Sequence, residues 1–425
     1  MMDTIFALSS GSPPAGIAVI RISGPLAGDA LQALAGRMPP PRMASLARLR
    51  DAAGAVLDEA LVLWFPGPAT VTGENLAELH LHGGRAVVAA VQARLAAMAG
   101  LRAAEAGEFT RRAFANGRID LTEAEGLGDL LSAETELQRL AAMDLMGGLL
   151  SRKVEGWRDR VLMLSARIEA VLDFDDEDDV ADVPPGFAGE VEALAQELRD
   201  ALMAPAAEML REGFRVALAG PPNAGKSTLF NALVESDAAI TAPIAGTTRD
   251  VLLRSVALGG IAFTFIDMAG LRDEGADDIE AIGIERAERE IARADLVLWL
   301  GDEGEGPADS WEISAMRDDV AAARKREARH YISARSGEGM DGLRRDLIGF
   351  AAAAMPRPGE AALNRRQRDL LGDAERALVL ARGQGDLLLL AEALRACRVA
   401  FDRLIGRSAT EDVLDTLFGR FCIGK

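Results

Sequence analysis

A stretch of eight residues near the middle of the chain constrains the fold most. It reads Gly-Pro-Pro-Asn-Ala-Gly-Lys-Ser from Gly220 to Ser227, the spacing of a phosphate-binding loop. The apolar residues 214–219 before it are typical of a buried strand, and residues 227–234 after it resemble the start of a helix. In that context backbone N–H groups converge on phosphate oxygens, Lys226 adds positive charge, and the Ser227 hydroxyl can bind Mg²⁺. The stretch predicts a nucleotide-binding domain rather than a chance glycine-rich turn.

Composition limits the classes of protein and partner. The 425 residues suffice for two or three packed domains, and the formal charge of -19 disfavours broad contact with nucleic acid or anionic membrane. An RNA partner would therefore need a local basic patch. The two cysteines, Cys397 and Cys422, are too far apart for a Cys-x-x-Cys site. With no export signal at the start and no apolar run of about 18 residues, we expect a cytoplasmic protein without a membrane span.

Residues 1–120 show the mixed pattern of an α+β domain. Residues 17–22 and 60–65 have the composition of strands, and residues 86–98 have the spacing of an amphipathic helix. A further strand ends in Gly83-Gly84, and His80 and His82 share one of its faces. Two such histidines could bind a metal, but the sequence shows no third ligand cluster, so an ordinary polar strand end is favoured.

Residues 121–212 and 358–425 have helical periodicity. Apolar residues from Val154 to Val171 recur at steps of three and four, which predicts a long helix in a bundle. Another helix is expected to start after Pro184-Pro185-Gly186 and to run to about Arg211. The acidic run at 173–179 could hold a divalent cation, but a solvated loop is favoured because nothing fixes a ligand geometry.

Residues 213–357 alternate strands with helices, which predicts a mainly parallel sheet with helices on both faces. The expected strands cover residues 214–219, 261–266, 296–300, 313–316 and 330–333. The simplest topology is a multidomain chain in which this α/β P-loop domain, which the motifs described next assign to the Ras-like GTPase type, is inserted between the two halves of one α-helical domain.

Motifs after the phosphate loop indicate GTP as the nucleotide. In the loop at 245–250, Thr248 would complete the Mg²⁺ shell, and Asp267-x-x-Gly270 would supply an outer-shell carboxylate and an N–H for the γ-phosphate. A backbone N–H in Ser333-Ala334-Arg335 could meet the guanine carbonyl. The usual Asn-Lys-x-Asp motif is replaced by residues 316–319, Met-Arg-Asp-Asp, where only Asp319 can still accept both guanine N–H groups. Guanine preference with weaker affinity is expected.

The chain resembles the MnmE (TrmE) family of GTPases that modify the wobble uridine of certain tRNAs. The resemblance covers nearly the whole length, including residues 3–5, 21–24, 107–114 and the terminal Phe-Cys-Ile-Gly-Lys at 421–425. It implies that the N-terminal domain forms a homodimer and binds a one-carbon donor, 5-formyltetrahydrofolate or a related folate. The implied folate contacts are Arg21, Glu78 and Arg118, with Lys425 close by. Arg118 stands where many relatives have Lys, so the charge is kept and the hydrogen-bond geometry differs.

The same resemblance implies a GTPase mechanism without an arginine finger. Leu271 follows Gly270, so the glutamine that positions water in Ras-like GTPases is missing. In the family, G domains dimerise across the nucleotide and K⁺ replaces the finger. The implied K⁺ ligands are Asn223, Ala242, Ile244 and Thr247, the Mg²⁺ ligands are Ser227 and Thr248, and the other nucleotide contacts include Ala224, Gly225 and Thr228. The predicted catalytic residues are Lys226, Arg249, Glu280, which would orient the attacking water, and Cys422.

The leading hypothesis is therefore a K⁺-dependent GTP hydrolase that adds a carboxymethylaminomethyl-type group at C5 of the wobble uridine. It would act on tRNA with an FAD-containing partner, MnmG (GidA), as a heterotetramer. For Cys422 a positioning role, or catalysis shared with the partner, is favoured over independent covalent catalysis. Two alternatives remain open: a GTP-driven switch or assembly protein without its own modification chemistry, and a folate enzyme regulated by its G domain. The presence of Arg21, Glu78 and Arg118 together with the terminal pentapeptide argues against a pure switch.

Overall fold

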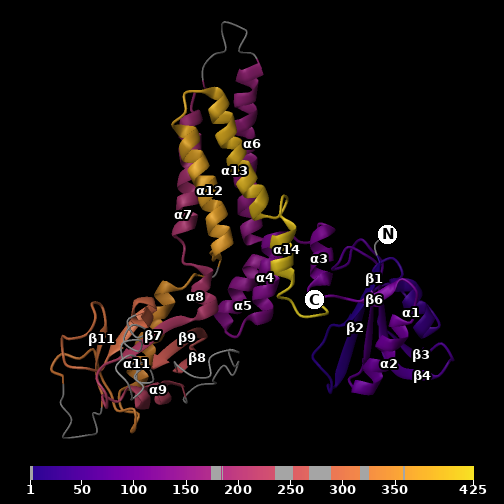
Figure 1. Ribbon diagram of the computed structural model, residues 1–425, viewed down its shortest axis with the longest axis horizontal. Coiled ribbons are helices and arrows are strands. Elements are labelled where there is room, and N and C mark those ends of the chain that lie inside the picture. Colours follow the sequence, from indigo (N-terminus) through magenta and orange to yellow (C-terminus); the bar gives the residue numbers. More distant parts are fainter. Residues whose placement is uncertain are drawn as a thin grey trace, which may run out of the picture. The chain divides into compact units, whose positions relative to one another are not determined.

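The computed structural model describes residues 3–173, 183, 185–234, 252–267, 289–315, 325–357 and 359–425 (Figure 1). The chain divides into two compact units. The first unit comprises Met1–Gly128, Leu150–Arg158 and Arg398–Lys425, and the second comprises Asp129–Leu149 and Asp159–Cys397. Among the described residues, no helix is both long and apolar enough to cross a membrane.

A mixed sheet of order β3-β4-β5-β2-β1-β6 forms the centre of the first unit. Its strands are β1 (Thr4–Leu8), β2 (Ile17–Ser23), β3 (Ser45–Arg50), β4 (Val56–Phe65), β5 (Leu76–His82) and β6 (Leu101–Ala103). β6 pairs with β1 in parallel and the other pairs are antiparallel. One face packs on α1 (Ala27–Ala35) and α2 (Arg85–Ala96), and Phe109 of α3 (Glu108–Ala115) packs on Ile5 and Ala7 of the other. The predicted strands at 17–22 and 60–65 and the helix at 86–98 are present as β2, β4 and α2.

Segments from both ends of the helical sequence contact α3 within the first unit. Helix α14 (Glu411–Phe418) contributes Leu414 and Phe418 to a cluster with Leu121 and Ala124 of α4 (Leu121–Ser132). A Cβ added to Gly107 would lie 2.2 Å from the carbonyl oxygen of Phe418, so the chain before α3 and the end of α14 meet backbone to backbone. Only glycine fits at this contact, because the φ of Gly107 is also +68°.

The remaining helices confirm the predicted helical stretches, with one correction. They are α5 (Glu136–Met146), α6 (Leu149–Asp173), α7 (Phe187–Met203), α8 (Ala207–Glu212), α12 (Arg365–Arg382) and α13 (Leu387–Leu404). The single helix expected to end near Arg211 is instead two helices, α7 and α8. The chain leaves the helix at Ala204, whose ψ is 147°, because a residue before proline disfavours the helical region and Pro205 follows. Most of the acidic run at 173–179 lies outside the described residues.

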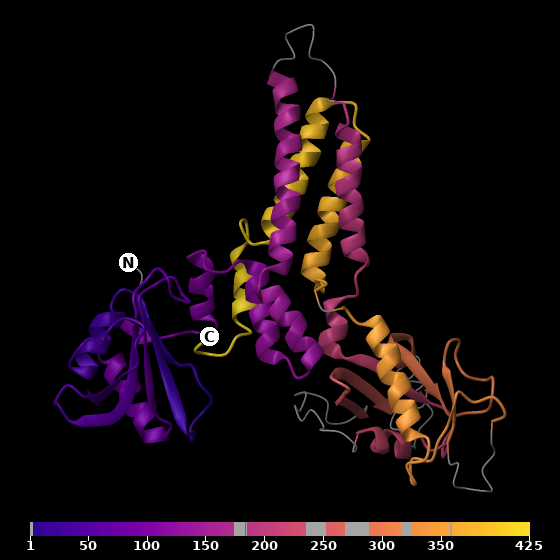
Figure 2. The same cartoon turned by 180° about the vertical axis from the view of Figure 1, so that it is seen from behind.

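Helices α7 and α12 pack against each other although the residues of the α/β domain separate them in the sequence (Figures 1 and 2). Arg199 of α7 pairs with Glu375 of α12 at 3.1 Å, and Glu192 of α7 pairs with Arg382 of α12 at 2.5 Å. Both ends of the α/β segment therefore connect to neighbouring helices of the second unit.

The second sheet, of order β12-β11-β10-β7-β9-β8, confirms a mainly parallel α/β arrangement. Its strands are β7 (Phe214–Ala219), β8 (Leu252–Leu258), β9 (Ile261–Asp267), β10 (Leu296–Trp299), β11 (Trp311–Ser314) and β12 (His330–Tyr331), accompanied by α9 (Lys226–Val234) and α11 (Met340–Ala354). Among the strands that the structure describes in this sheet, the edge strand β8 alone is antiparallel, and it is absent from the strands expected from the sequence. β11 lies two residues earlier than expected, and β12 is limited to two residues.

Candidate functional site

The loop at 220–225 joins the end of β7 to the start of α9, as its sequence predicts. The backbone is left-handed at Asn223 (φ 62°) and at Gly225 (φ 92°), a conformation that lets successive N–H groups point toward a common anion. The Lys226 side chain is only 6 % exposed, and its Nζ donates to the carbonyl oxygens of Gly220 at 2.9 Å and Pro221 at 2.8 Å. Its ammonium group is thereby held over the loop, while the side chains of Asn223, Ser227 and Thr228 are exposed.

Other predicted nucleotide contacts lie at the same edge of the sheet. Asp267 ends β9 next to Leu218 of β7, in a parallel pair, and it is 1 % exposed. Ser333 follows β12 and is fully buried, its Oγ accepting the N–H of Ser336 at 3.1 Å. Arg335 is exposed and Ala334 half-buried. The carboxyl ends of parallel strands are the common place for ligands in such sheets, so these residues surround one region.

Eight predicted site residues lie outside the described part of the chain. They are Ala242, Ile244, Thr247, Thr248, Arg249, Gly270, Glu280 and Asp319. Their assignments remain predictions from the sequence.

A polar pair stands on the face of the first sheet opposite α1 and α2. Arg21 of β2 and Glu78 of β5 are directly opposite in register, with Nη2 and Oε1 2.9 Å apart and Nε and Oε1 3.1 Å apart. The Arg21 guanidinium lies 5.8 Å from the centre of the Phe109 ring of α3. Arg118 lies beside the loop before β5, its Cγ 3.3 Å from the position that a Cβ on Gly73 would take. Three of the predicted folate contacts thus belong to the same unit, and two of them bind each other.

The histidines on β5 are each bound to a carboxylate. His80 Nε2 lies 3.3 Å from Glu78 Oε2, and His82 Nδ1 lies 2.7 Å from Asp58 Oδ1. Among the residues that the structure describes, no three His, Cys, Asp or Glu side chains gather as a metal would require. Each histidine is thus paired with a carboxylate of its own sheet.

The C-terminal tail after α14 runs onto the first sheet. Phe421 packs near Gly128 of α4, and Ile423 forms an antiparallel bridge with Ala106. A Cβ on Gly424, whose φ is +97°, would lie 2.2 Å from the carbonyl oxygen of Leu8 at the end of β1. Lys425 is thus placed near β1, whose Ala7 is the register partner of Arg21. Cys422 is exposed between the packed Phe421 and the bridged Ile423.

A partly buried group of charged side chains, which the sequence alone does not indicate, fixes α3: Arg112, Glu108 and Glu74 are largely buried, and Asp3 and Arg102 are half-exposed. Arg112 Nη2 lies 2.9 Å from Glu108 Oε1 and 2.8 Å from Asp3 Oδ1, and its Nη1 lies 3.2 Å from Glu74 Oε2. Arg102 also binds Asp3 and Glu108. Hydrogen bonds from Arg102 and Arg112 hold the pKa of Asp3 below its ordinary value. Burial disfavours the charge on Glu108, yet its hydrogen bonds to Arg102, the Glu105 backbone and Arg112 still lower its pKa. In the sequence, Asp3 and the stretch at 107–114 stand out only through the family resemblance at residues 3–5 and 107–114.

We expect Arg112→Met to lower the free energy of unfolding of the first unit by about 3 kcal/mol, because it leaves buried carboxylates without their partner. Arg111→Met is the matched control: Arg111 is next in sequence but its ion pairs with Glu411 and Asp415 are exposed, so about 1 kcal/mol or less is expected. Urea unfolding followed by amide hydrogen exchange measures both. Equal losses in the two variants would contradict this account.

The lowered pKa values of Asp3 and Glu108 also predict a pH dependence. Their stabilising contribution is present above the unfolded-state pKa values, about 4. It is lost as the pH falls through the lower folded-state values, so stability should decrease on acidification below about pH 4. In Arg112→Met this part of the pH dependence should be smaller, which unfolding at pH 7 and pH 3 would measure.

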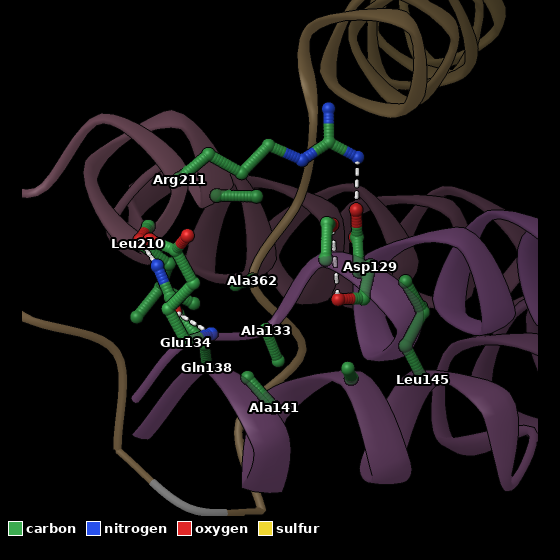
Figure 3. A pocket seen from close by; sticks show the side chains of 12 residues that line it. Asp129, Ala133, Glu134, Gln138, Ala141, Leu145, Leu210, Arg211 and Ala362 are labelled. Atoms are coloured by element: carbon green, nitrogen blue, oxygen red, sulfur yellow. Dashed lines mark hydrogen bonds and ion pairs between the residues drawn. The ribbon is translucent and has the colours of Figure 1, made fainter. Parts of the chain in front are cut away.

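A cavity of about 230 Å³ in the second unit lies among α4, α5 and α8 (Figure 3). Arg211 forms an ion pair with Asp129 at its rim, and Gln138 Nε2 donates to the carbonyl of Leu210 at 2.6 Å. Much of the remaining lining is alanine and leucine, at positions 133, 141, 142, 145, 207 and 362. None of the predicted site residues that the structure describes lines this cavity, and the phosphate loop at 220–227 is not part of it.

Two family models and several full-length relatives match this chain, and all of them indicate the same family. A family model described as "GTP-binding protein TrmE N-terminus" matches residues 4–118, and one described as "MnmE helical domain" matches residues 121–422. Proteins named "tRNA modification GTPase MnmE" are similar to the chain: 61 % identity over 437 residues for Novosphingobium aromaticivorans and 60 % over 425 for Erythrobacter litoralis, with 100 % of both chains covered in each case. The protein of that name from Rhizorhabdus wittichii is 59 % identical over 428 residues, covering 100 % of this chain and 97 % of the relative.

Proposed function

The chain belongs to the MnmE family of tRNA modification GTPases, and from this premise we propose that it hydrolyses GTP in a K⁺-dependent reaction. Hydrolysis would serve the addition of a carboxymethylaminomethyl-type group to C5 of the wobble uridine, together with an FAD-containing partner of the MnmG (GidA) kind in a heterotetramer. The observation that carries the proposal is the phosphate loop, where a left-handed Asn223 and a buried Lys226 adjoin the exposed start of α9.

The residues at this loop fit the phosphates and Mg²⁺ of bound GTP. Ser227 is exposed at the first turn of α9, at the sheet edge where β9 ends in the Asp267 carboxylate, and hydroxyl and carboxylate oxygens suit Mg²⁺. We assign Ser227 and Thr248 as the ligands. The ion would neutralise charge on the β- and γ-phosphates. Lys226 would bind phosphate oxygens, Arg249 would assist, and Glu280 would orient the attacking water.

The proposed K⁺ site uses the same loop. Asn223 is exposed, so its side-chain oxygen is available to a cation, and Thr247 with the carbonyls of Ala242 and Ile244 would complete the shell. K⁺ would place positive charge near the transferring phosphoryl group, as an arginine finger does in other GTPases. This site requires a dimer of G domains, which would exclude water from the nucleotide.

The first unit would bind the folate and form the homodimer. Leu46 and Leu61 are 57 % and 46 % exposed, and the strand register places both on the sheet face that carries Arg21 and Glu78. Exposed apolar residues on one sheet face suit a second copy of the chain. Arg21, Glu78 and Arg118, with Lys425 of the docked tail, would hold the glutamate and pterin groups of a 5-formyltetrahydrofolate-type donor.

The proposed domain limits are 1–120, 121–212, 213–357 and 358–425. The packing of α7 on α12 supports insertion of the third segment into one helical domain, because helices from before and after it are neighbours. Conformational change in the GTPase segment would then reach the helices through two connections.

Mass analysis of wobble nucleosides from cells lacking this chain tests the proposed function. Complementation with the wild type should restore the modified uridine, and complementation with Lys226→Ala should not. Lys153→Ala, at an exposed position in α6, is the control and should restore it. Glu280→Ala tests whether the modification needs hydrolysis: if a variant that binds GTP without hydrolysing it restores the modified uridine, GTP binding alone suffices and hydrolysis is dispensable.

Base specificity should depend on Asp319, the one carboxylate that can accept both guanine N–H groups in the altered base motif. We expect Asp319→Asn to weaken GDP binding by about 10-fold or more and to gain binding of xanthosine diphosphate, because Asn can donate to the xanthine carbonyl. Calorimetry with GDP, ADP and xanthosine diphosphate measures the change. Undiminished GDP preference would show that residues 316–319 do not read the base.

A further inference from the structure

A second buried lysine lies near the carboxyl edge of the second sheet, outside the phosphate loop. The Lys325 side chain is 7 % exposed, and its Nζ donates to the carbonyl oxygen of Trp299, the last residue of β10, at 2.7 Å. It also forms an ion pair with Glu312 of β11. We propose that Lys325 is a positioning residue for the bound nucleotide, because it fixes the loop at 300–310 against the phosphate loop. This inference rests on the proposed phosphate-binding role of residues 220–227.

The loop at 300–310 lies directly on the phosphate loop. Leu300 N donates to the carbonyl oxygen of Ala219 at 2.8 Å, which continues the pairing of β10 with β7. A Cβ on Gly220 would lie 2.9 Å from Gly301 N, and a Cβ on Gly301 would lie 3.0 Å from Pro221 Cδ. The first two residues of the phosphate loop therefore have no room to move toward this loop, and their conformation depends on where it lies.

The Trp299 indole contacts the loop at 300–310 through a hydrogen bond and through close packing against two glycines. Its Nε1 donates to the carbonyl of Asp302 at 2.8 Å. A Cβ on Gly301 would lie 2.4 Å from Trp299 Cζ2, and one on Gly306 would lie 2.7 Å from its Cγ. Both glycines are thus packed against the ring, so the position of Trp299 determines the path of the loop.

Lys325 and the two residues after it are linked to the loop at 300–310 through Glu312 and Glu303. Glu312, the ion-pair partner of Lys325, also accepts the N–H of Gly304 at 3.1 Å. Glu303 accepts the backbone N–H groups of Arg326 at 2.9 Å and Glu327 at 2.7 Å. Two hydrogen bonds therefore join the loop at 300–310 directly to residues 326 and 327, and Glu312 links Lys325 to Gly304 of the loop. Residues 325–327 follow the proposed base-reading segment 316–319 in the sequence.

Removing the Lys325 charge should loosen this loop and so raise the entropic cost of ordering the phosphate loop around a nucleotide. Loss of this buried ammonium group also leaves the Glu312 carboxylate and the Trp299 carbonyl without its hydrogen bonds. We expect an effect on nucleotide affinity and not on the chemical step, since Lys325 reaches Trp299 and Glu312 rather than the phosphates. The chain lacks the lysine of the usual Asn-Lys-x-Asp motif, so nucleotide affinity depends more on contacts elsewhere in the domain.

Calorimetric titration of the full-length protein with GDP and Mg²⁺ tests the inference. Lys325→Met should raise the Kd about 10-fold with a stoichiometry still near one, while kcat at saturating GTP stays unchanged. Lys325→Arg, which keeps the charge, should recover most of the affinity. The control is Lys153→Met, the same substitution at an exposed lysine of α6, which should bind like the wild type.

Two results would overturn the inference while wild-type binding is intact. One is a Kd for Lys325→Met within about twofold of the wild type. The other is a lower stoichiometry at unchanged Kd, which would mean that the substitution only reduces the folded fraction. A wild-type protein that fails to bind GDP would instead overturn the proposed function itself, and this inference with it.

Discussion

GTP turnover by this protein is expected to fall about 10³-fold when K⁺ is replaced by Na⁺, the lower end of what an arginine finger contributes. The sequence has Leu271 where a water-positioning glutamine would stand, and the described part of the phosphate loop offers Asn223 in an exposed, left-handed position. Na⁺ is smaller than K⁺ and would not be held by the same oxygen atoms. Steady-state phosphate release in matched K⁺ and Na⁺ buffers measures the effect, and turnover per molecule should rise with protein concentration as G domains dimerise.

Asn223→Ala should abolish the K⁺ stimulation while GDP still binds, because Lys226 and the backbone N–H groups of the loop remain. The matched control is Asn231→Ala, which changes an exposed asparagine further along α9 that is not among the proposed K⁺, Mg²⁺ or nucleotide contacts. Equal rates in the two salts, without concentration dependence, would exclude the cation-assisted dimer mechanism. A variant that loses K⁺ stimulation and GDP binding together would instead mark Asn223 as part of the loop fold.

The second large effect is expected at the end of the chain. Gly424→Ala should reduce wobble-uridine modification by about 10²-fold while K⁺-stimulated GTPase activity stays near that of the wild type. A Cβ at Gly424 would stand 2.2 Å from the Leu8 carbonyl oxygen, and the φ of +97° is one that alanine rarely adopts. The end of the tail must then leave β1, which displaces Lys425 by far more than the roughly 1 Å that costs about 10²-fold at a reacting centre.

Gly11→Ala is the control for this substitution, because it lies in the loop just after β1 and a Cβ there meets nothing within 4 Å. Nucleoside mass analysis and phosphate release, measured on the same protein preparations, separate the two activities. Normal modification by Gly424→Ala would mean that docking of the tail is not required for the chemistry. Loss of both activities would point to a general folding defect.

Local features of the fold followed from the sequence, and long-range ones did not. The strand at 214–219, the loop and helix α9 could be predicted because glycine spacing and apolar periodicity act over a few residues. The break between α7 and α8 also has a local cause, because Pro205 disfavours the helical conformation at Ala204.

The charged group around α3 had no such signal. Asp3 and Glu74 are distant in the sequence from Arg112, and each alone resembles an ordinary surface charge. The strand register that brings Arg21 onto Glu78 depends likewise on the pairing of β2 with β5. Family resemblance named Arg21 and Glu78 as functional residues, but only the fold shows that they bind each other.

Helix α3 packs against both ends of the chain, so sequence changes at one end constrain those that the other end can accept. Gly107, just before α3, lies against the carbonyl of Phe418, and Phe109 of α3 lies against the Arg21 guanidinium. One short helix thus contacts both the C-terminal segment and the N-terminal sheet. In chimaeras between diverged relatives, the N-terminal domain and the C-terminal tail should therefore be exchangeable only as a block. Swapping either alone would pair a helix with contacts selected for another sequence, even though the GTPase segment between them is left untouched.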